Sequence, residues 1–330
     1  MNLTAITDHD PQAIVLDTAL CNRTALLLSD MQRHTIAFGE SGSGKTVTVI
    51  APLAKSFLVL GDLSTHWASV VMIDPKRELG DLTRSLLASR GQQNRLMEIG
   101  VRPFDLFEGL AQHPLTQRAE LLRRLAFEMP RTGENSMWIC MAQSLFDQLV
   151  KADGEWYQAK GHQGDECLFA DLMCTSESDQ APGNRMHCYM LLLQSLMQRD
   201  NMLRRASTEI RRRLAEVGLP PSLDPLVNYI AEGELVKQFA YLTQILDPML
   251  RTLSSSDLYA VLDCDPVRTR KSHCVSIGRH LDAGGVVLYQ PPSSMFKFDQ
   301  LVGRTLKSAC FRHAFARAGK RPMAYVCDEF

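Results

Sequence analysis

Eight consecutive residues near the start of the chain have the types and spacing of a phosphate-binding loop. They match the pattern G-x-x-x-x-G-K-[ST] and are Gly39, Glu40, Ser41, Gly42, Ser43, Gly44, Lys45 and Thr46. Glycine lets the backbone turn so that successive N–H groups face an anion, and a helix that begins near Gly44 adds the positive end of its dipole. The pattern therefore predicts that these residues bind a nucleotide through its phosphates.

Two side chains of this loop carry the expected chemistry. Lys45 can reach the β- and γ-phosphates as a mobile cation, and Thr46 can offer its hydroxyl to Mg²⁺. The flanking sequence fits, because residues 34–38 predict a short buried strand and residues 47–60, apart from Pro52, predict a helix. A Gly/Ser-rich loop that matches by chance is the alternative, and the strand–loop–helix context leads us to favour the nucleotide site.

A pair of acids follows the last apolar segment of the chain. Residues 323–330 read Met-Ala-Tyr-Val-Cys-Asp-Glu-Phe, an apolar strand that ends in Asp328 and Glu329. This is the form of a Walker B element, in which Asp328 would hold Mg²⁺ and Glu329 would orient and polarise the attacking water. Together with the phosphate loop, the pair predicts ATP and Mg²⁺ as cofactors. An ATPase sheet normally continues beyond this strand, so we expect a nucleotide-binding domain that is incomplete at its C-terminus.

The composition is that of an ordinary globular protein. Of the 330 residues, 45% are hydrophobic and 22% are charged, which suits one large domain or two smaller ones. The net charge of −1 gives no overall basic signature, so DNA would have to bind a local basic patch. The chain has no apolar run of 18 residues, and no basic segment precedes Asp8 and Asp10, so we expect neither a membrane helix nor a secretory signal. These features predict a cytoplasmic protein.

The nine cysteines are scattered and show no regular spacing. Four of them lie in apolar contexts and predict buried thiols in a reducing cytosol; they are Cys21, Cys140, Cys310 and Cys327. A mixed group of histidines and cysteines raises the question of a zinc site; it comprises His162, Cys167, Cys174, His187 and Cys188. The group contains no C-x-x-C pair and fits no common finger spacing, so we do not interpret it as a metal site.

The order of apolar segments indicates where the chemistry is placed. Residues 1–33 form a mixed polar lead-in with one expected strand at 13–16. Residues 34–109 then alternate, with strands expected at 69–74 and 95–101 and a helix at 77–89 between them. This alternation predicts an α/β fold with a parallel sheet flanked by helices, and it puts Asp74 at the edge of the sheet where a nucleotide would bind.

A long helical region interrupts the sheet pattern. Residues 110–263 are rich in Leu, Met, Ala, Gln and Arg, and predict an all-α insertion domain. Its expected helices are residues 116–127, 135–152, 186–217 and 232–262. The sheet pattern returns with a strand at 284–290, a helix at 299–317 and the final strand from Met323. The nucleotide-binding domain is therefore expected to be discontinuous, comprising residues 34–109 and 264–330.

Several of these motifs together resemble one protein family. Residues 74–79 read Asp-Pro-Lys-Arg-Glu-Leu, which resembles the Asp-Pro-Lys-Gly-Glu-Leu signature of type IV secretion coupling proteins, the TraG/TraD-like DNA-translocating ATPases of conjugation. Arg77 stands where that family usually has Gly. Residues 135–138 and 252–256 are similar to two further family segments, and the terminal Asp-Glu-Phe resembles the family's Walker B element. The resemblance covers residues 34–330 and includes the helical insertion.

The resemblance implies a RecA-like P-loop NTPase fold and an ATP-dependent motor that moves DNA. It implies relaxosome and secretion-channel proteins as partners, a homo-hexamer if the chain is complete, and a place at the inner face of the cytoplasmic membrane through those partners. Family members commonly carry N-terminal membrane helices, a polar sensor residue and an arginine acting on a neighbour's nucleotide, which this sequence does not contain. We therefore expect the chain alone to hydrolyse ATP poorly. An FtsK/HerA-like translocase and a non-catalytic nucleotide-binding scaffold are the alternatives.

Two basic stretches offer candidate DNA contacts. The first lies on one expected helix and comprises Arg204, Arg205, Arg211, Arg212 and Arg213. Glu209 and Glu216 are available as local partners, so we favour a solvated helix face over a phosphate-tracking surface. The second stretch allows the same two interpretations and comprises Arg268, Arg270, Lys271, His273, Arg279 and His280.

Overall fold

The structure is a computed structural model with two compact units. The first unit comprises Met1–Phe104 and Val275–Phe330, and the second comprises Asp105–Cys274. The residues that the structure describes are 14–17, 25–27, 44–59, 68–126, 136–161, 167–170, 184–198, 200–219, 224, 227, 233–268, 271–291, 296–317 and 323–327, in part by their backbone alone.

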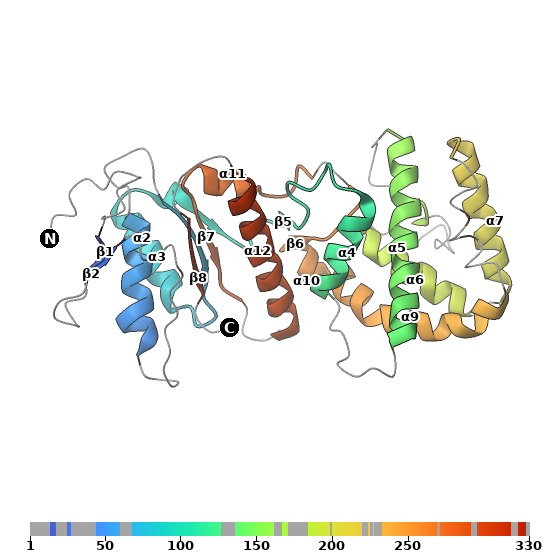
Figure 1. The fold of residues 1–330 in the computed structure, drawn as a ribbon, viewed down its shortest axis with the longest axis horizontal. Coiled ribbons are helices and arrows are strands. Elements are labelled where there is room, and N and C mark those ends of the chain that lie inside the picture. Colours follow the sequence, from blue (N-terminus) through green and yellow to red (C-terminus); the bar gives the residue numbers. More distant parts are fainter. Residues whose placement is uncertain are drawn as a thin grey trace. The chain divides into compact units, whose positions relative to one another are not determined.

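A four-stranded parallel sheet forms the centre of the first unit (Figure 1). Its strands are ordered β4 (Leu96–Glu98), β7 (Val286–Tyr289), β3 (Ser69–Ile73) and β8 (Met323–Cys327). Val70 of β3 lies opposite Val286 on one side and Ala324 on the other. The expected strands at 69–74, 95–101, 284–290 and from Met323 are thus confirmed, and the prediction of a mixed α/β fold with a parallel sheet is correct.

Helices cover both faces of this sheet (Figure 1). On one face lie α2 (Ala51–Val59) and α3 (Glu78–Ser89), and on the other lie α11 (Ile277–Asp282) and α12 (Phe296–Ala316). A separate antiparallel pair is formed by β1 (Ile14–Asp17) and β2 (Ala25–Leu27). All five side chains of β3 are buried, which is the pattern of a parallel strand covered on both faces.

The helix expected at 47–60 begins with a wide turn. Residues Thr46–Ile50 are π-helical (η2), and the Ala51 N–H donates to the Thr46 carbonyl five residues back. Pro52 has no N–H, and its ring would crowd the carbonyl four residues before it in a regular α-helix. The wide turn removes this conflict, after which α2 continues to Val59.

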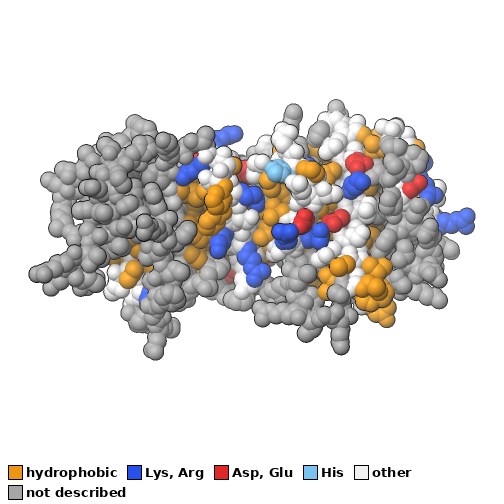
Figure 2. Space-filling view, in the orientation of Figure 1, with side chains coloured by type: hydrophobic (Ala, Val, Ile, Leu, Met, Phe, Trp, Pro, Cys, Tyr) orange, Lys and Arg blue, Asp and Glu red, His pale blue; other side chains and the backbone are white. Residues whose placement is uncertain are grey.

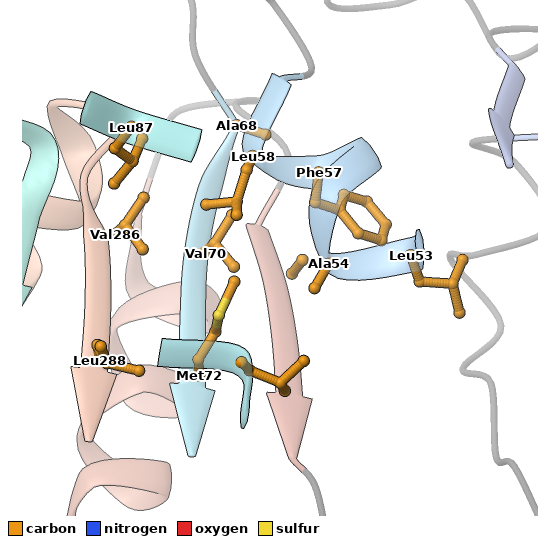
Figure 3. Close-up of a cluster of buried hydrophobic side chains, with 12 residues drawn as sticks. Leu53, Ala54, Phe57, Leu58, Ala68, Val70, Met72, Leu87, Val286 and Leu288 are labelled. Atoms are coloured by element: carbon orange, nitrogen blue, oxygen red, sulfur yellow. The ribbon is translucent and has the colours of Figure 1, made fainter. Parts of the chain in front are cut away.

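Alternate side chains of the central strands build an apolar core against α2 and α3. Figure 3 shows this cluster, whose fully buried members include Ala54 and Leu58 of α2, Val70 and Met72 of β3, and Leu288 of β7. Burying one such large aliphatic side chain contributes about 1.5–3 kcal/mol. The period of two along β3 therefore determines which residues face α2.

A buried arginine connects the segments at the other end of these strands. Arg95, immediately before β4, donates through Nε to the Gly284 carbonyl at 2.9 Å. Its two terminal nitrogens donate to the carbonyls of Leu58 (3.2 Å) and Ala68 (3.1 Å). One side chain thus satisfies main-chain acceptors at the end of α2 and before β3 and β7, groups that would be costly to bury without partners.

The second unit is mainly helical. Its long helices are α4 (Leu115–Ala126), α5 (Ser136–Ala159), α6 (Arg185–Gln198), α7 (Asp200–Glu216) and α9 (Gly233–Ser254). The unit is slightly wider than the region predicted to be helical, residues 110–263. Two helices, α6 and α7, occupy the range expected to hold a single helix at 186–217.

The helix expected to reach residue 262 ends earlier. α9 stops at Ser254, and Ser255 then caps the short helix α10 (Ser256–Tyr259), accepting a hydrogen bond from the Leu258 N–H at 3.3 Å. The hydroxyls of Thr252, Ser254 and Ser255 bond back to main-chain carbonyls, which competes with the helical pattern. The chain next forms β6 (Leu262–Asp263), which pairs with β5 (Phe104–Asp105), so the prediction of a wholly helical segment is wrong at this end.

Buried ion pairs connect separate segments of the second unit. Arg185 at the start of α6 is 2% exposed, and it donates to Asp153 of α5 at 2.6 Å and to Asp265 at 3.1 Å. Asp153 also accepts from the Tyr189 hydroxyl (2.7 Å) and the Leu168 N–H (2.8 Å). Burial alone would raise the pKa of Asp265, but the positive charges of Arg185 and Lys271 lower it to about 2.

Among the described helices, none combines the length and the apolar character needed to cross a membrane.

We expect Arg95→Met to lower the free energy of unfolding by about 3 kcal/mol, because it leaves buried carbonyls without donors at roughly 1–3 kcal/mol each. Chemical denaturation at neutral pH measures the change. Arg90 is an exposed arginine in the same unit, and Arg90→Met should change stability by less than about 0.5 kcal/mol. Equal losses in the two variants would contradict the role given to Arg95.

Arg185→Met should lower stability by about 3–5 kcal/mol, since it leaves the buried carboxylate of Asp153 without its cation and removes one of the cations beside Asp265. The matched variant is Arg251→Met, which removes an exposed pair with Asp247 and should cost at most about 0.5 kcal/mol. Denaturation monitored by circular dichroism distinguishes the two effects. A small loss for Arg185→Met would show that the buried network is not what holds α5 to α6.

Candidate functional site

The described part of the phosphate loop is its last turn, Gly44 to Thr46. Gly44 has a left-handed backbone with φ +80°, and Lys45 already has helical angles (φ −49°, ψ −45°). The Thr48 N–H and its Oγ1 both donate to the Gly44 carbonyl at 2.9 Å, which closes the first turn of the helix. Gly44 is therefore required by conformation, since a side chain at this φ is strained whatever space surrounds it.

The start of this helix has the electrostatic character that an anion site needs. Lys45 and Thr46 are partly exposed, and the first turn contains no acidic side chain. No carboxylate in this first turn therefore competes with an anion for the N–H groups and the positive end of the helix dipole. The other predicted loop residues, Gly39 to Ser43, lie outside the described residues, as do the expected strand at 34–38, Asp328 and Glu329.

Asp74 lies at the carboxyl end of β3, as predicted, and is fully buried. Its N–H donates to the Tyr289 carbonyl at 2.9 Å, which extends the pairing of β3 with β7 by one residue. Its Oδ2 accepts from the Gly80 N–H (2.7 Å) and from Gln290 Nε2 (3.0 Å). Its Oδ1 accepts no hydrogen bond from the part of the chain that the structure describes.

Gly80 makes the approach of Gln290 to Asp74 possible. A Cβ at residue 80 would overlap the end of the Gln290 side chain, so a larger residue there would displace Gln290 from its present position. Sequence analysis did not identify Gly80 or Gln290. The available signal was weak: Gln290 is a polar residue at the end of an apolar strand, next to the strand that ends in Asp74.

Polar side chains continue along this edge of the sheet to β4. Arg84 of α3 binds both carboxylate oxygens of Glu98, at 2.9 and 3.0 Å, and donates to Gln290 Oε1 at 2.5 Å. The hydrogen bonds from Arg84 lower the pKa of Glu98. The carboxyl ends of β3, β7 and β4 are therefore joined in the order Asp74, Gln290, Arg84, Glu98.

The turn after Asp74 holds a residue in an unusual conformation. Arg77 has φ +65° and ψ +10°, and it is the one non-glycine residue with positive φ among those described. Left-handed backbone costs an L-residue roughly 1–2 kcal/mol, and glycine avoids that cost. Arg77 is also the position at which the coupling-protein signature has Gly, so the backbone there adopts the conformation that glycine favours.

Three arginines of the first basic stretch are paired with acids of their own unit. Arg212 binds Glu209 and Glu216, Arg213 binds Glu209 at 2.8 Å, and Arg211 lies 3.5 Å from Asp224. The hydrogen bonds from Arg212 and Arg213 lower the pKa of Glu209 to about 2. Figure 2 shows basic and acidic side chains mixed on the face in view. For Arg211 and Arg212, which are exposed, the interpretation as a solvated helix face is confirmed. Arg213 is only 12% exposed and also donates to the Leu168 carbonyl, so it is not part of that face.

Two residues of the second basic stretch are buried in ion pairs, while Arg279 is exposed. Lys271 is 2% exposed and binds Asp105 and Asp263, while Arg268 is 10% exposed and lies near Asp265. In the first unit, His280 Nε2 lies 2.8 Å from the Arg95 carbonyl. Arg270 is outside the described residues.

The described cysteines form no disulfide bonds with one another. Cys310 is buried as predicted, and so are Cys167 and Cys188 of the mixed histidine–cysteine group. Cys140 is exposed and Cys327 is only partly buried, so the prediction that they are buried is wrong, and Cys21 lies outside the described residues. On α5 the buried stripe includes Ile139 and Ala142, and Cys140 lies off that stripe.

Comparison with protein-family models, with curated proteins and with solved structures found no match.

We expect Arg77→Gly to raise the free energy of unfolding by about 0.5–1 kcal/mol. Relief of left-handed strain, about 1–2 kcal/mol, exceeds the additional chain entropy of glycine in the unfolded state, roughly 0.5–1 kcal/mol. Arg90→Gly is the matched variant, because Arg90 ends the same helix with φ −105°. That variant should lower stability in a urea titration, and destabilisation by both would argue against strain at Arg77.

Proposed function

We propose that this chain binds Mg-ATP at residues 39–46 and belongs to a DNA-translocating motor of the coupling-protein type. The observation that carries the proposal is the left-handed Gly44, followed directly by Lys45 and by Thr46 at the start of a helix. This conformation of the last turn supports a phosphate loop, in which N–H groups, a cation and a hydroxyl would face one anion. The fold in this proposal is the RecA-like P-loop type.

Each predicted residue has a defined task in this mechanism. Lys45 contacts the β- and γ-phosphates, and Thr46 and Asp328 hold Mg²⁺. When bound, Mg²⁺ offsets charge on the β- and γ-phosphates. Glu329 orients the attacking water and accepts its proton.

A second observation supports the coupling-protein type over other nucleotide-binding proteins. Arg77 replaces the glycine of the family signature, and its backbone is left-handed. In the same segment, Asp74 caps the turn by accepting from the Gly80 N–H. At the one position where this segment differs from the signature Asp-Pro-Lys-Gly-Glu-Leu, the backbone adopts the conformation that glycine favours, which supports the resemblance.

The remaining parts of the proposal follow from this type. The cargo is DNA, the partners are relaxosome and secretion-channel proteins, and the working assembly is a homo-hexamer at the inner face of the cytoplasmic membrane. Because Arg211, Arg212 and Arg213 are paired with acids, these three are not assigned to the DNA surface.

We expect Lys45→Ala to weaken the binding of Mg-ATP by about tenfold or more, since a hydrogen bond to a charged group contributes roughly 1.5–3 kcal/mol. Isothermal titration calorimetry on the full chain measures the affinity. Lys55→Ala is the control, because Lys55 is an exposed lysine on α2, the continuation of the same helix. If wild type and Lys45→Ala bind Mg-ATP with equal affinity, the proposed nucleotide site is wrong.

ATP turnover with and without DNA then separates the motor from a nucleotide-binding scaffold. A motor shows hydrolysis that DNA stimulates and that Glu329→Gln abolishes, with nucleotide affinity retained. ATP binding without turnover, in the presence of DNA and of the proposed partners, would assign the chain to the scaffold class.

A further inference from the structure

Three side chains of different chemical types meet in the second unit, away from the phosphate loop in the sequence. Asp263 is the last residue of β6, and His273 and Cys274 are the last two residues of the unit. Asp263 Oδ2 lies 2.8 Å from His273 Nε2 and 3.8 Å from Cys274 Sγ. The Sγ–Nε2 distance is 3.4 Å, so the three atoms form a compact triangle.

The dimensions of this triangle are close to those around a tetrahedral zinc ion. Zinc bonds of about 2.0–2.1 Å to nitrogen, 2.0–2.2 Å to oxygen and 2.3 Å to sulfur put the ligand atoms about 3.3–3.6 Å apart. The two distances that involve Sγ, 3.4 and 3.8 Å, already lie near this range. Only the Nε2–Oδ2 distance of 2.8 Å has to open, by about 0.5 Å, to admit the ion.

Neighbouring groups hold the ligands in place. Asp263 Oδ1 accepts from Lys271 Nζ at 2.9 Å and from the Asp265 N–H at 2.8 Å, which directs Oδ2 toward His273 and Cys274. The ring of Tyr259 stacks on His273 with centroids 5.9 Å apart and an interplanar angle of 26°. Such outer contacts are what fix carboxylate and imidazole ligands at metal sites.

The same geometry argues against a thiol nucleophile. In a relay of acid, histidine and nucleophile, the acid and the nucleophile contact opposite nitrogens of the imidazole. Here Asp263 and Cys274 both lie against Nε2. Convergence of three donor atoms on one point suits a cation and not a proton relay.

We propose that Asp263, His273 and Cys274 bind a transition-metal ion of the zinc class. The Cys274 Sγ–H bond breaks as the sulfur–metal bond forms, and its proton passes to solvent. His273 binds as the neutral tautomer that carries its ring proton on Nδ1, so that the Nε2 lone pair faces the ion. Asp263 is buried, whereas the His273 side chain is 35% exposed, which leaves a path for entry and a fourth position for water. The ion joins the end of β6 to the segment that follows Lys271.

The sequence alone does not reveal this site. The ligands occupy positions 263, 273 and 274, which match no C-x-x-C or zinc-finger spacing. His273 was grouped with the basic residues around it, and the cysteines considered for a metal lay in another segment. Only the return of the chain past β6 brings Cys274 to Asp263.

The test uses the purified full chain, stripped with a chelator and titrated with Co²⁺ and Zn²⁺ under reducing conditions. We expect one equivalent of Co²⁺ to produce a thiolate-to-cobalt absorption band, and Zn²⁺ to displace it. Cys274→Ser should abolish the band, and His273→Asn should weaken zinc binding by about tenfold or more. Cys140→Ser is the matched control, since Cys140 is an exposed free thiol, and it should leave both unchanged.

Thermal unfolding provides a second measurement that does not depend on the cobalt absorption band. Zinc should raise the unfolding temperature of the wild type and of Cys140→Ser, but not that of Cys274→Ser. Circular dichroism of the metal-free proteins establishes that the variants are folded. A wild type without the cobalt band, or a band that persists in folded Cys274→Ser, would overturn the proposal.

Discussion

Parallel pairing of β3 with both β7 and β8 is the constraint on which the first unit depends. Parallel strands cannot be joined by tight turns, so each return of the chain needs a covering element, here α2 and α3 on one face and α11 and α12 on the other. The same pairing brings the carboxyl ends of the strands to one edge, where Asp74 and Gln290 meet. At the opposite end, Arg95 satisfies carbonyls that precede the strands.

In the second unit, buried charged side chains connect the helices. Asp153, Arg185 and Asp265 lie between α5, α6 and the segment after β6. Desolvating such groups is costly, and the cost is offset only when each carboxylate has a cation and further donors. Tyr189 and the Leu168 N–H supply those donors to Asp153. The result is an arrangement in which few alternative packings can satisfy every charge, which favours one relative placement of these elements.

Two residues in the sequence motifs have a left-handed backbone conformation. Gly44 and Arg77 both adopt it, one before the start of η2 and the other before the start of α3. Glycine adopts this conformation without strain at Gly44, whereas Arg77 adopts it at a cost in backbone energy. That strained residue lies next to the sheet edge that carries Asp74. The hydrogen bond from the Gly80 N–H to Asp74, together with the Asp74 carbonyl that accepts from the Arg77 N–H at 3.3 Å, holds that turn in place.

The sequence by itself determined the α/β class, the parallel sheet, the positions of its four strands and the location of Asp74, because hydrophobic periodicity and strand-end polarity are local properties. It could not determine that α9 ends at Ser254, since serine hydroxyls compete with the helix only through specific hydrogen bonds. Nor could it pair Arg185 with Asp265, Gln290 with Asp74, or Cys274 with Asp263. Those partners are 80, 216 and 11 residues apart, and only the tertiary structure decides which distant polar groups become neighbours once water is excluded.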